Sequence, residues 1–161
     1  MENDSDPKSF AAHVRRFRPE DTDDLVALVK EAPQAATWSA ESYLDFAKES
    51  GSVGLIVEVG GEIGGFLIGR QITADAEILN LAVAPRHRRK GEGAKLLKAA
   101  LAEFRLRGVK SVYLEVRESN TDAILFYERH GFVITGHRKG YYHQPEEPAI
   151  TMEKKLTASM G

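Results

Sequence analysis

The length, composition and charge of the chain exclude several classes of protein. Its 161 residues are 42% hydrophobic and 29% charged, which is the balance of a globular protein rather than a disordered or fibrous one. The absence of cysteine excludes disulfides, thiolate metal sites and a cysteine-bound acyl intermediate. Since no apolar run approaches the roughly 20 residues of a membrane helix and the formal net charge is −2, we expect a cytosolic protein that binds neither membranes nor nucleic acid directly.

The first half of the chain predicts one strand, two helices and a hairpin. We interpret residues 1–12 as a flexible leader, residues 13–156 as a single domain and residues 157–161 as a tail. The helices are expected within 20–32 and after Trp38, where Ser39 or Ser42 offers a cap and Gly51 an end. Strands are expected at 13–17, 53–59, 62–72 and 77–83, with Gly60 and Gly61 as the hairpin turn between the second and third.

The second half predicts a parallel strand–helix–strand unit. Apolar residues recur at helical spacing from Gly93 until Gly108, and this stretch lies between strands at 77–83 and 111–116. A strand, a crossover helix and a second strand within about 40 residues form a parallel pair. A further helix is expected over "TDAILFYERHG", capped by Asn120 or Thr121, before two last strands at 132–138 and 149–155.

A basic segment, "RHRRKGEG" at residues 86–93, lies between a predicted buried strand and the first turn of the central helix. The first turn of a helix exposes unpaired N–H groups, and glycines there let an anion approach the backbone closely. Arg88, Arg89 and Lys90 add positive charge. The segment therefore favours a phosphate site, although a solvated basic loop is an open alternative at this point.

The spacing of the glycines separates the known kinds of phosphate loop. A P-loop needs Lys and then Ser or Thr after its last glycine, whereas Ala94 and Lys95 follow Gly93 here. A dinucleotide-binding fingerprint needs glycine or alanine at position 96, which is Leu96, but Glu115 does imitate its ribose-binding acid. The basic residues are confined to one loop, which disfavours a nucleic-acid surface. An NAD-binding protein therefore stays open as a weaker alternative.

The segment "LNLAVAPRHRRKGEGAKLL" resembles the acetyl-coenzyme A motif of the GCN-related N-acetyltransferases, and "LEVRESNTDAILFYERHGF" resembles their second signature. The order of predicted elements agrees with that family from His13 to about Leu156. "TWSAESY" and "RKGYYHQ" are also similar to segments of the bacterial ribosomal-protein alanine N-acetyltransferases. The resemblance implies a single-domain α/β fold. Its mixed, mostly antiparallel sheet has six to seven strands and about four flanking helices, with the parallel unit at the cofactor site.

The resemblance also implies acetyl-coenzyme A as the cofactor and assigns its contacts. A strand edge would hold the pantetheine arm, and the loop with the helix start would wrap the pyrophosphate. Two positions depart from the family pattern. Glu92 stands where an apolar residue is commoner; its side chain can point outward, but a carboxylate beside a pyrophosphate would weaken cofactor affinity. Arg88 stands where Gln is usual and would compensate in charge. The assigned residues are Leu81, Ala82, Val83, Arg88, Arg89, Lys90, Gly91, Glu92, Gly93, Ala94 and Asn120.

Two residues fall on the general base and the general acid of the resembled family, Glu115 and Tyr127. An amine attacks a thioester only as the free base, so a carboxylate must accept its proton, and the departing thiolate needs a proton in return. A phenol, with a reference pKa of about 10, carries that proton at neutral pH. From the residues alone, an ion pair of Glu115 with Arg117 or Arg70 and a core-packed Tyr127 are the preferred interpretations.

Three aromatic residues are candidates for the acceptor groove, Trp38 before the second helix and Tyr141 and Tyr142 between the last two strands. Surface packing on neighbouring backbone is an alternative for each. The five histidines show no ligand pattern, so we expect no metal. The expected partner is a protein N-terminus, of a ribosomal protein in the resembled enzymes, and the expected state is a monomer or weak dimer. A small amine, an internal lysine, or coenzyme A binding without turnover are the alternatives.

Overall fold

The computed structural model describes residues 12–32, 35–88, 90–143 and 146–156. The predicted leader, apart from Ala12, and the predicted tail lie outside the described residues, as does Arg89. The described chain forms seven strands, four α-helices and two short 3-10 turns. In chain order these are β1 (Ala12–Arg16), η2 (Pro19–Asp21), α2 (Thr22–Lys30), α3 (Ala40–Ala47), β2 (Ser52–Val59), β3 (Glu62–Ile72), β4 (Asp75–Val83), η3 (Pro85–His87), α4 (Glu92–Leu106), β5 (Ser111–Arg117), α5 (Thr121–Arg129), β6 (Val133–Tyr142) and β7 (Glu147–Lys155).

The strands are hydrogen-bonded in the order β1-β2-β3-β4-β5-β7-β6. The β4–β5 pair is parallel, and β1–β2, β2–β3, β5–β7 and β6–β7 are antiparallel. This confirms the predicted mixed, mostly antiparallel sheet with a parallel strand–helix–strand unit. The chain divides into two compact units, unit 1 (Met1–Arg70 with Leu79–Glu103) and unit 2 (Gln71–Ile78 with Phe104–Gly161).

Unit 1 buries apolar side chains on one face of its strands against α2 and α3. Both helices are amphipathic, and the periodicity that predicts them also selects the residues that they bury. Ser39 caps α3, because its hydroxyl accepts the Ser42 N–H. This core contains Leu25, Leu28, Val29, Ala32, Tyr43, Phe46, Ile56, Phe66, Ile68, Ala82 and Ala84.

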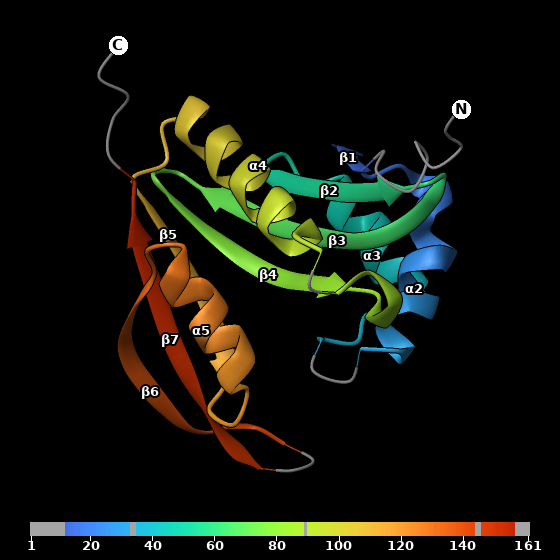
Figure 1. Ribbon diagram of the computed structural model, residues 1–161. Coiled ribbons are helices and arrows are strands. Elements are labelled where there is room, and N and C mark those ends of the chain that lie inside the picture. Colours follow the sequence, from blue (N-terminus) through green and yellow to red (C-terminus); the bar gives the residue numbers. More distant parts are fainter. Residues whose placement is uncertain (1–11, 33–34, 89, 144–145, 157–161) are drawn as a thin grey trace, which may run out of the picture. The chain divides into compact units, whose positions relative to one another are not determined.

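The opposite face of the unit 1 strands is also buried, and Figure 1 shows α4 over it. Leu55 lies opposite Leu67 in the β2–β3 ladder, and both side chains are buried outside the α2–α3 core. Leu97 and Ala100, on the helical stripe predicted from the sequence, are fully buried on α4, and so is the neighbouring Leu96. The strands of unit 1 are therefore buried on both faces, by α2 and α3 on one side and by α4 on the other.

Unit 2 contains the strands β5, β7 and β6 with helix α5. Leu114 pairs with Met152 in the β5–β7 ladder and both are buried, so this face of the strands is the apolar one. The opposite face carries Glu115, paired with Thr151, and Arg117, paired with Ala149. The alternation of β5 that the sequence predicts is therefore confirmed, and it leaves the polar face half-exposed.

Several element boundaries differ from the predictions, and those of α3, β6 and α4 bear on the candidate residues. Helix α3 ends at Ala47 and its C-cap is Lys48, so Gly51 does not end it. Strand β6 continues to Tyr142, four residues beyond the predicted end, because its partner β7 begins at Glu147 rather than at 149. Helix α4 begins at Glu92, one residue before Gly93.

Candidate active site

The start of α4 has the backbone geometry of an anion site. Gly91 has φ +87°, in the left-handed region that favours glycine, and it directly precedes the helix. The first intrahelical bond runs from the Lys95 N–H to the Gly91 carbonyl, at 3.0 Å. Among the residues that the structure describes, the N–H groups of Glu92, Gly93 and Ala94 have no acceptor. These amides, at the positive end of the helix dipole, fit a phosphate group.

The basic residues before α4 divide into two groups. Arg86 turns toward unit 1's carboxylates, with its Nε 2.9 Å from Glu62 Oε1. Arg88 is exposed and donates to the Val83 carbonyl at 3.2 Å, while Lys90 is exposed. Arg86 therefore belongs to another network, and Arg88 and Lys90 are the described cations beside the helix start.

The Glu92 side chain does not take the outward direction that the sequence left open to it. Glu92 is only 4% exposed, and its Oε1 is buried without a hydrogen-bond partner. The first residue of α4 is the first residue of its amphipathic pattern, and position 92 lies four residues before the buried Leu96 on the same helical face. The apolar residue that is commoner at this position is consistent with that inward direction.

The predicted strand edge, Leu81 to Val83, is the last part of β4. The parallel ladder between β4 and β5 contains three residue pairs, from Asp75–Ser111 to Glu77–Tyr113, so residues 81–83 come after its end. On the β3 side the strands approach closely at Gly65, where an added Cβ would lie 2.7 Å from the Ala82 carbonyl oxygen. Glycine is therefore required at position 65 to keep this end of β4 in place.

The carboxylate of Glu115 is held in an ion pair, but not with either residue that the sequence suggested. Its Oε2 accepts a hydrogen bond of 2.7 Å from Arg138 Nη1, on β6. Arg117 pairs with Glu147 at 3.2 Å and Arg70 with Glu49 at 3.5 Å. The alternation of β5 places Glu115 on its polar face, with the side chain 24% exposed. It is thus accessible enough to exchange a proton with a ligand.

Tyr127 is the buried aromatic of α5, which agrees with the core-packed interpretation, while its role as the general acid stays a prediction. The residue is 6% exposed and its ring contacts Phe126 and Phe132, with centroid separations of 5.2 and 5.4 Å. Burial raises the pKa of its phenol well above the ordinary value. The phenol therefore carries its proton at neutral pH, as a general acid must.

Asn120 has a structural role in this state of the protein. Its Oδ1 accepts the Ala123 N–H at 3.2 Å and so caps α5, as predicted. The assigned contact to the cofactor stays a prediction, with the side-chain amide as the available donor.

The three candidate acceptor aromatics lie in different surroundings. Trp38 is half-buried against the unit 1 core, with its ring 5.3 Å from Tyr43 and 5.7 Å from Phe46. Tyr141 and Tyr142 form the end of β6 rather than the predicted interstrand loop. The two rings meet edge to face at 5.0 Å. The negative charge of Glu115 raises the pKa of Tyr141, and burial raises that of Tyr142.

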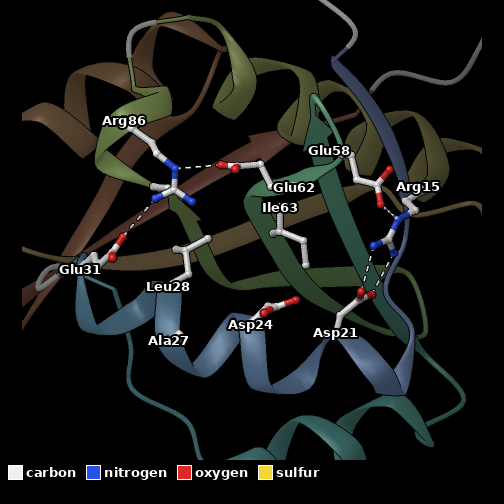
Figure 2. Close-up of a pocket in the computed structure, with 12 residues that line it drawn as sticks. Arg15, Asp21, Asp24, Ala27, Leu28, Glu31, Glu58, Glu62, Ile63 and Arg86 are labelled. Carbon is white, nitrogen blue, oxygen red and sulfur yellow. Dashed lines mark hydrogen bonds and ion pairs between the residues drawn. The ribbon is translucent and has the colours of Figure 1, made fainter. Parts of the chain in front are cut away.

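A separate cavity of about 340 Å³ lies in unit 1 and is lined by none of the predicted site residues. Figure 2 shows two ion-pair groups on its walls. Arg15 bonds Asp21 at 2.9 Å and Glu58 at 2.8 Å, and Arg86 contacts Glu62 and Glu31. The first group therefore connects β1 with η2 and β2, and the second connects η3 with β3 and with the residue that follows α2.

No group of three or more metal-binding side chains gathers anywhere in the described ranges. The same ranges contain no helix that is long and apolar enough to cross a membrane.

Comparisons with known proteins agree on one family. Residues 17–132 match the model of the acetyltransferase (GNAT) family. A relative from Escherichia coli strain K12, named [ribosomal protein bS18]-alanine N-acetyltransferase, is 34% identical over 138 residues, covering 82% of this chain and 91% of the relative.

Two solved structures have the same fold at substantial sequence identity. The crystal structure of the ribosomal-protein-S18-alanine N-acetyltransferase from E. coli superposes with a TM-score of 0.81 at 27% identity, covering 93% of this chain and 96% of that one. Ard1 from Thermoplasma volcanium superposes with a TM-score of 0.84 at 32% identity, covering 91% and 99%. The chain therefore belongs to the acetyltransferase (GNAT) family and is an N-acetyltransferase.

Proposed function

We propose that this enzyme transfers the acetyl group of acetyl-coenzyme A directly to the α-amine of a protein N-terminus, and that its acceptor is the N-terminal alanine of a small-subunit ribosomal protein. The observation that carries this proposal is the E. coli relative, which is named for that acceptor and matches over 91% of its length. The family membership supports acetyl-coenzyme A as the donor.

The residues of the α4 start fit the diphosphate of such a donor. The three amides without an acceptor among the described residues would bind phosphate oxygens, and Arg88 and Lys90 would add charge from their side chains. The end of β4, Leu81 to Val83, would bind the amide-containing arm of the donor by strand-like hydrogen bonds. The buried carboxylate of Glu92 opposes the diphosphate by charge, and Arg88 and Lys90 before it would offset that repulsion.

The chemistry then assigns a role to each proposed catalytic residue. When bound, acetyl-coenzyme A supplies the thioester carbon that the free amine attacks. Glu115 accepts the proton that the ammonium form of the acceptor must lose, directly or through water. Tyr127 donates the proton that the departing thiolate needs, since burial keeps its phenol protonated. The new amide bond forms as the thioester C–S bond breaks, so no covalent intermediate on the enzyme is required.

An α-amine suits a single carboxylate base better than a lysine side chain does. The reference pKa of an α-amine is about 8 and that of lysine about 10.4. An α-amine is therefore partly neutral at cellular pH, whereas lysine needs about two further pKa units of assistance. This difference favours a protein N-terminus over an internal lysine as the acceptor.

The proposal is tested by release of coenzyme A thiol with a panel of hexapeptides. We expect peptides that begin with alanine to be turned over fastest and mass spectrometry to locate the acetyl group on the α-nitrogen. The matched controls are the same alanine peptide with a blocked N-terminus and an added internal lysine, and a polyamine such as spermidine.

Other outcomes assign other functions. Preferential turnover of the blocked lysine peptide or of spermidine would move the acceptor to a lysine or a small amine. A rise in melting temperature with acetyl-coenzyme A, without thiol release for any amine, would indicate a coenzyme A-binding module without turnover. A rise with NAD and none with coenzyme A would contradict the assignment of the α4 start.

A further inference from the structure

The ion pair of Glu115 spans a whole strand, and this distance restricts the kinds of side chain that can be its partner. Glu115 lies on β5 and Arg138 on β6, and β7 separates these two strands in the sheet. Two strand spacings amount to roughly 10 Å, a gap that only a long side chain closes from β6. In the register, Arg138 lies opposite Ala149 of β7, whose methyl group leaves room on this face. The 2.7 Å contact therefore depends on a long side chain at 138 and a small one at 149.

Arg138 also belongs to a layer within unit 2 in which two aromatic rings, Tyr141 and Tyr142, lie between two cations, Arg138 and Arg117. Its guanidinium lies 4.3 Å from the centroid of the Tyr141 ring, and Tyr141 meets Tyr142 edge to face. Tyr142 in turn lies 4.5 Å from the Arg117 guanidinium. Cations over aromatic faces attract the ring quadrupole. The layer thus runs without a break from the proposed base to both proposed acceptor tyrosines.

The far end of the layer is fixed to the backbone before α5. Arg117 donates to Glu147 Oε1 at 3.2 Å and to the His143 carbonyl at 3.2 Å. The other oxygen of that carboxylate, Glu147 Oε2, accepts the Ser119 N–H at 2.6 Å. Both ends of the layer are therefore anchored, by Glu115 at one end and by Glu147 at the other.

We propose that Arg138 is the positioning residue for the Glu115 carboxylate and couples the orientation of that base to the tyrosines at the end of β6. This inference rests on the proposed function, in which Glu115 is the base. A carboxylate on an extended strand has free side-chain rotation, and a hydrogen bond to one of its oxygens removes most of it. A proton acceptor displaced by about 1 Å costs roughly 100-fold in rate.

The exposure of the Glu115–Arg138 pair allows an effect on catalysis to be distinguished from an effect on folding stability. The side chain of Arg138 is 58% exposed, and an exposed ion pair contributes little to folding stability. Removal of the guanidinium is therefore expected to change turnover and to leave the melting temperature almost unchanged. A residue that only stabilised the fold would behave in the opposite way.

The test compares Arg138→Met with Arg138→Lys and with Lys139→Met in thiol-release assays on an alanine peptide. Lys139→Met removes one cation from the next position of β6, where the side chain is exposed and forms no ion pair with Glu115 in the described part of the chain. We expect Arg138→Met to lower kcat roughly 10- to 100-fold with KM changed less than about threefold. Arg138→Lys restores part of the loss, and Lys139→Met behaves as the wild type.

The double variant Glu115→Gln with Arg138→Met gives the decisive measurement. If Arg138 acts through Glu115, its replacement has no further effect once the carboxylate is gone. Additive losses in the double variant, an effect confined to KM, or unchanged kcat in Arg138→Met would each overturn the inference while the wild type remains active. A wild type that acetylates no amine would instead refute the proposed function, and the inference with it.

Discussion

The proposed cofactor residues of unit 1 and the proposed catalytic residues of unit 2 are specified by different parts of the chain. In unit 1 the proposed phosphate site consists of backbone N–H groups at the start of α4, which follow a glycine of positive φ. In unit 2 the proposed base is a side chain, and its partner Arg138 comes from two strands away. A site made of backbone groups is formed by residues that are adjacent in the sequence, whereas a pair of side chains on different strands depends on the register of the sheet. We therefore expect substitutions in unit 1 to change cofactor affinity or stability, and substitutions in unit 2 to change turnover.

The largest effect is expected for Glu115→Gln in unit 2. The amide keeps the size of the side chain but does not accept a proton, so kcat/KM falls roughly 100- to 10,000-fold. Thiol release with an alanine peptide measures this loss, and unchanged affinity for acetyl-coenzyme A shows that unit 1 is unaffected. Glu118→Gln, on an exposed carboxylate just after β5, is the matched control. Near-normal turnover of Glu115→Gln between pH 6 and 9 would remove Glu115 as the base.

Tyr127→Phe, also in unit 2, removes one hydroxyl from a buried ring. The phenylalanine ring retains the contacts with Phe126 and Phe132, so the fold is expected to persist. Turnover falls about 100-fold because the leaving thiolate loses its proton donor. A steady-state assay measures the turnover of the variant, and far-ultraviolet circular dichroism shows whether it is folded. An unfolded variant would favour the core-packing interpretation of Tyr127, and full activity would exclude it as the acid.

Asp21→Asn is expected to lower the stability of unit 1 without a specific effect on the chemistry. Burial pushes the pKa of Asp21 upward, but hydrogen bonds from Arg15 and from the Arg18 N–H outweigh it and lower the pKa below its ordinary value. Loss of the negative charge leaves Arg15 with one carboxylate partner fewer, at a cost of about 2 kcal/mol in the free energy of unfolding at pH 7. Urea unfolding measures this difference.

The pH dependence of that difference follows from the direction of the shift. A carboxylate with a lowered folded-state pKa stabilises the protein above its unfolded pKa, near 4, and loses this contribution as the pH falls through the folded value. The gap between wild type and Asp21→Asn is therefore expected to be constant from pH 7 to about 5 and to shrink below 4. Asp24→Asn, on the same cavity wall but without an ion pair among the described residues, is the control (Figure 2). Equal losses in both variants would refute the role of the Arg15 pair.

The smallest expected effect is that of Gly91→Ala at the start of α4. The added methyl group meets nothing within 4 Å, but φ +87° is strained for any residue with a Cβ. If the backbone at position 91 moves to a less strained φ, the N–H groups at the start of α4 change direction. We expect this to weaken binding of acetyl-coenzyme A about tenfold, which calorimetric titration measures. Gly108→Ala, with φ +83° and the same open surroundings at the other end of the helix, carries equal strain away from the anion site. Equal affinity in the two variants would contradict an anion site at Gly91.

Residue patterns alone determined the main helices and strands of this protein. Helical periodicity predicted α2 and α4, paired glycines predicted the β2–β3 hairpin, and the spacing from β4 to β5 predicted their parallel pairing. The glycines before α4 predicted a helix start with unpaired N–H groups, and the phosphate that these groups would bind stays a prediction. Each of these features depends on residues close together in the chain, and their geometry follows from local sterics.

Only the tertiary structure decided the partners of the charged side chains. Arg117 and Arg70 were the sequence's candidates for Glu115, yet Arg138 pairs with it, because antiparallel pairing of β6 with β7 brings position 138 opposite Ala149. The register also places Tyr141 and Tyr142 in a strand, and the packing of α4 buries Glu92. Strand register and helix packing depend on residues far apart in the chain, so a local pattern carries no record of them.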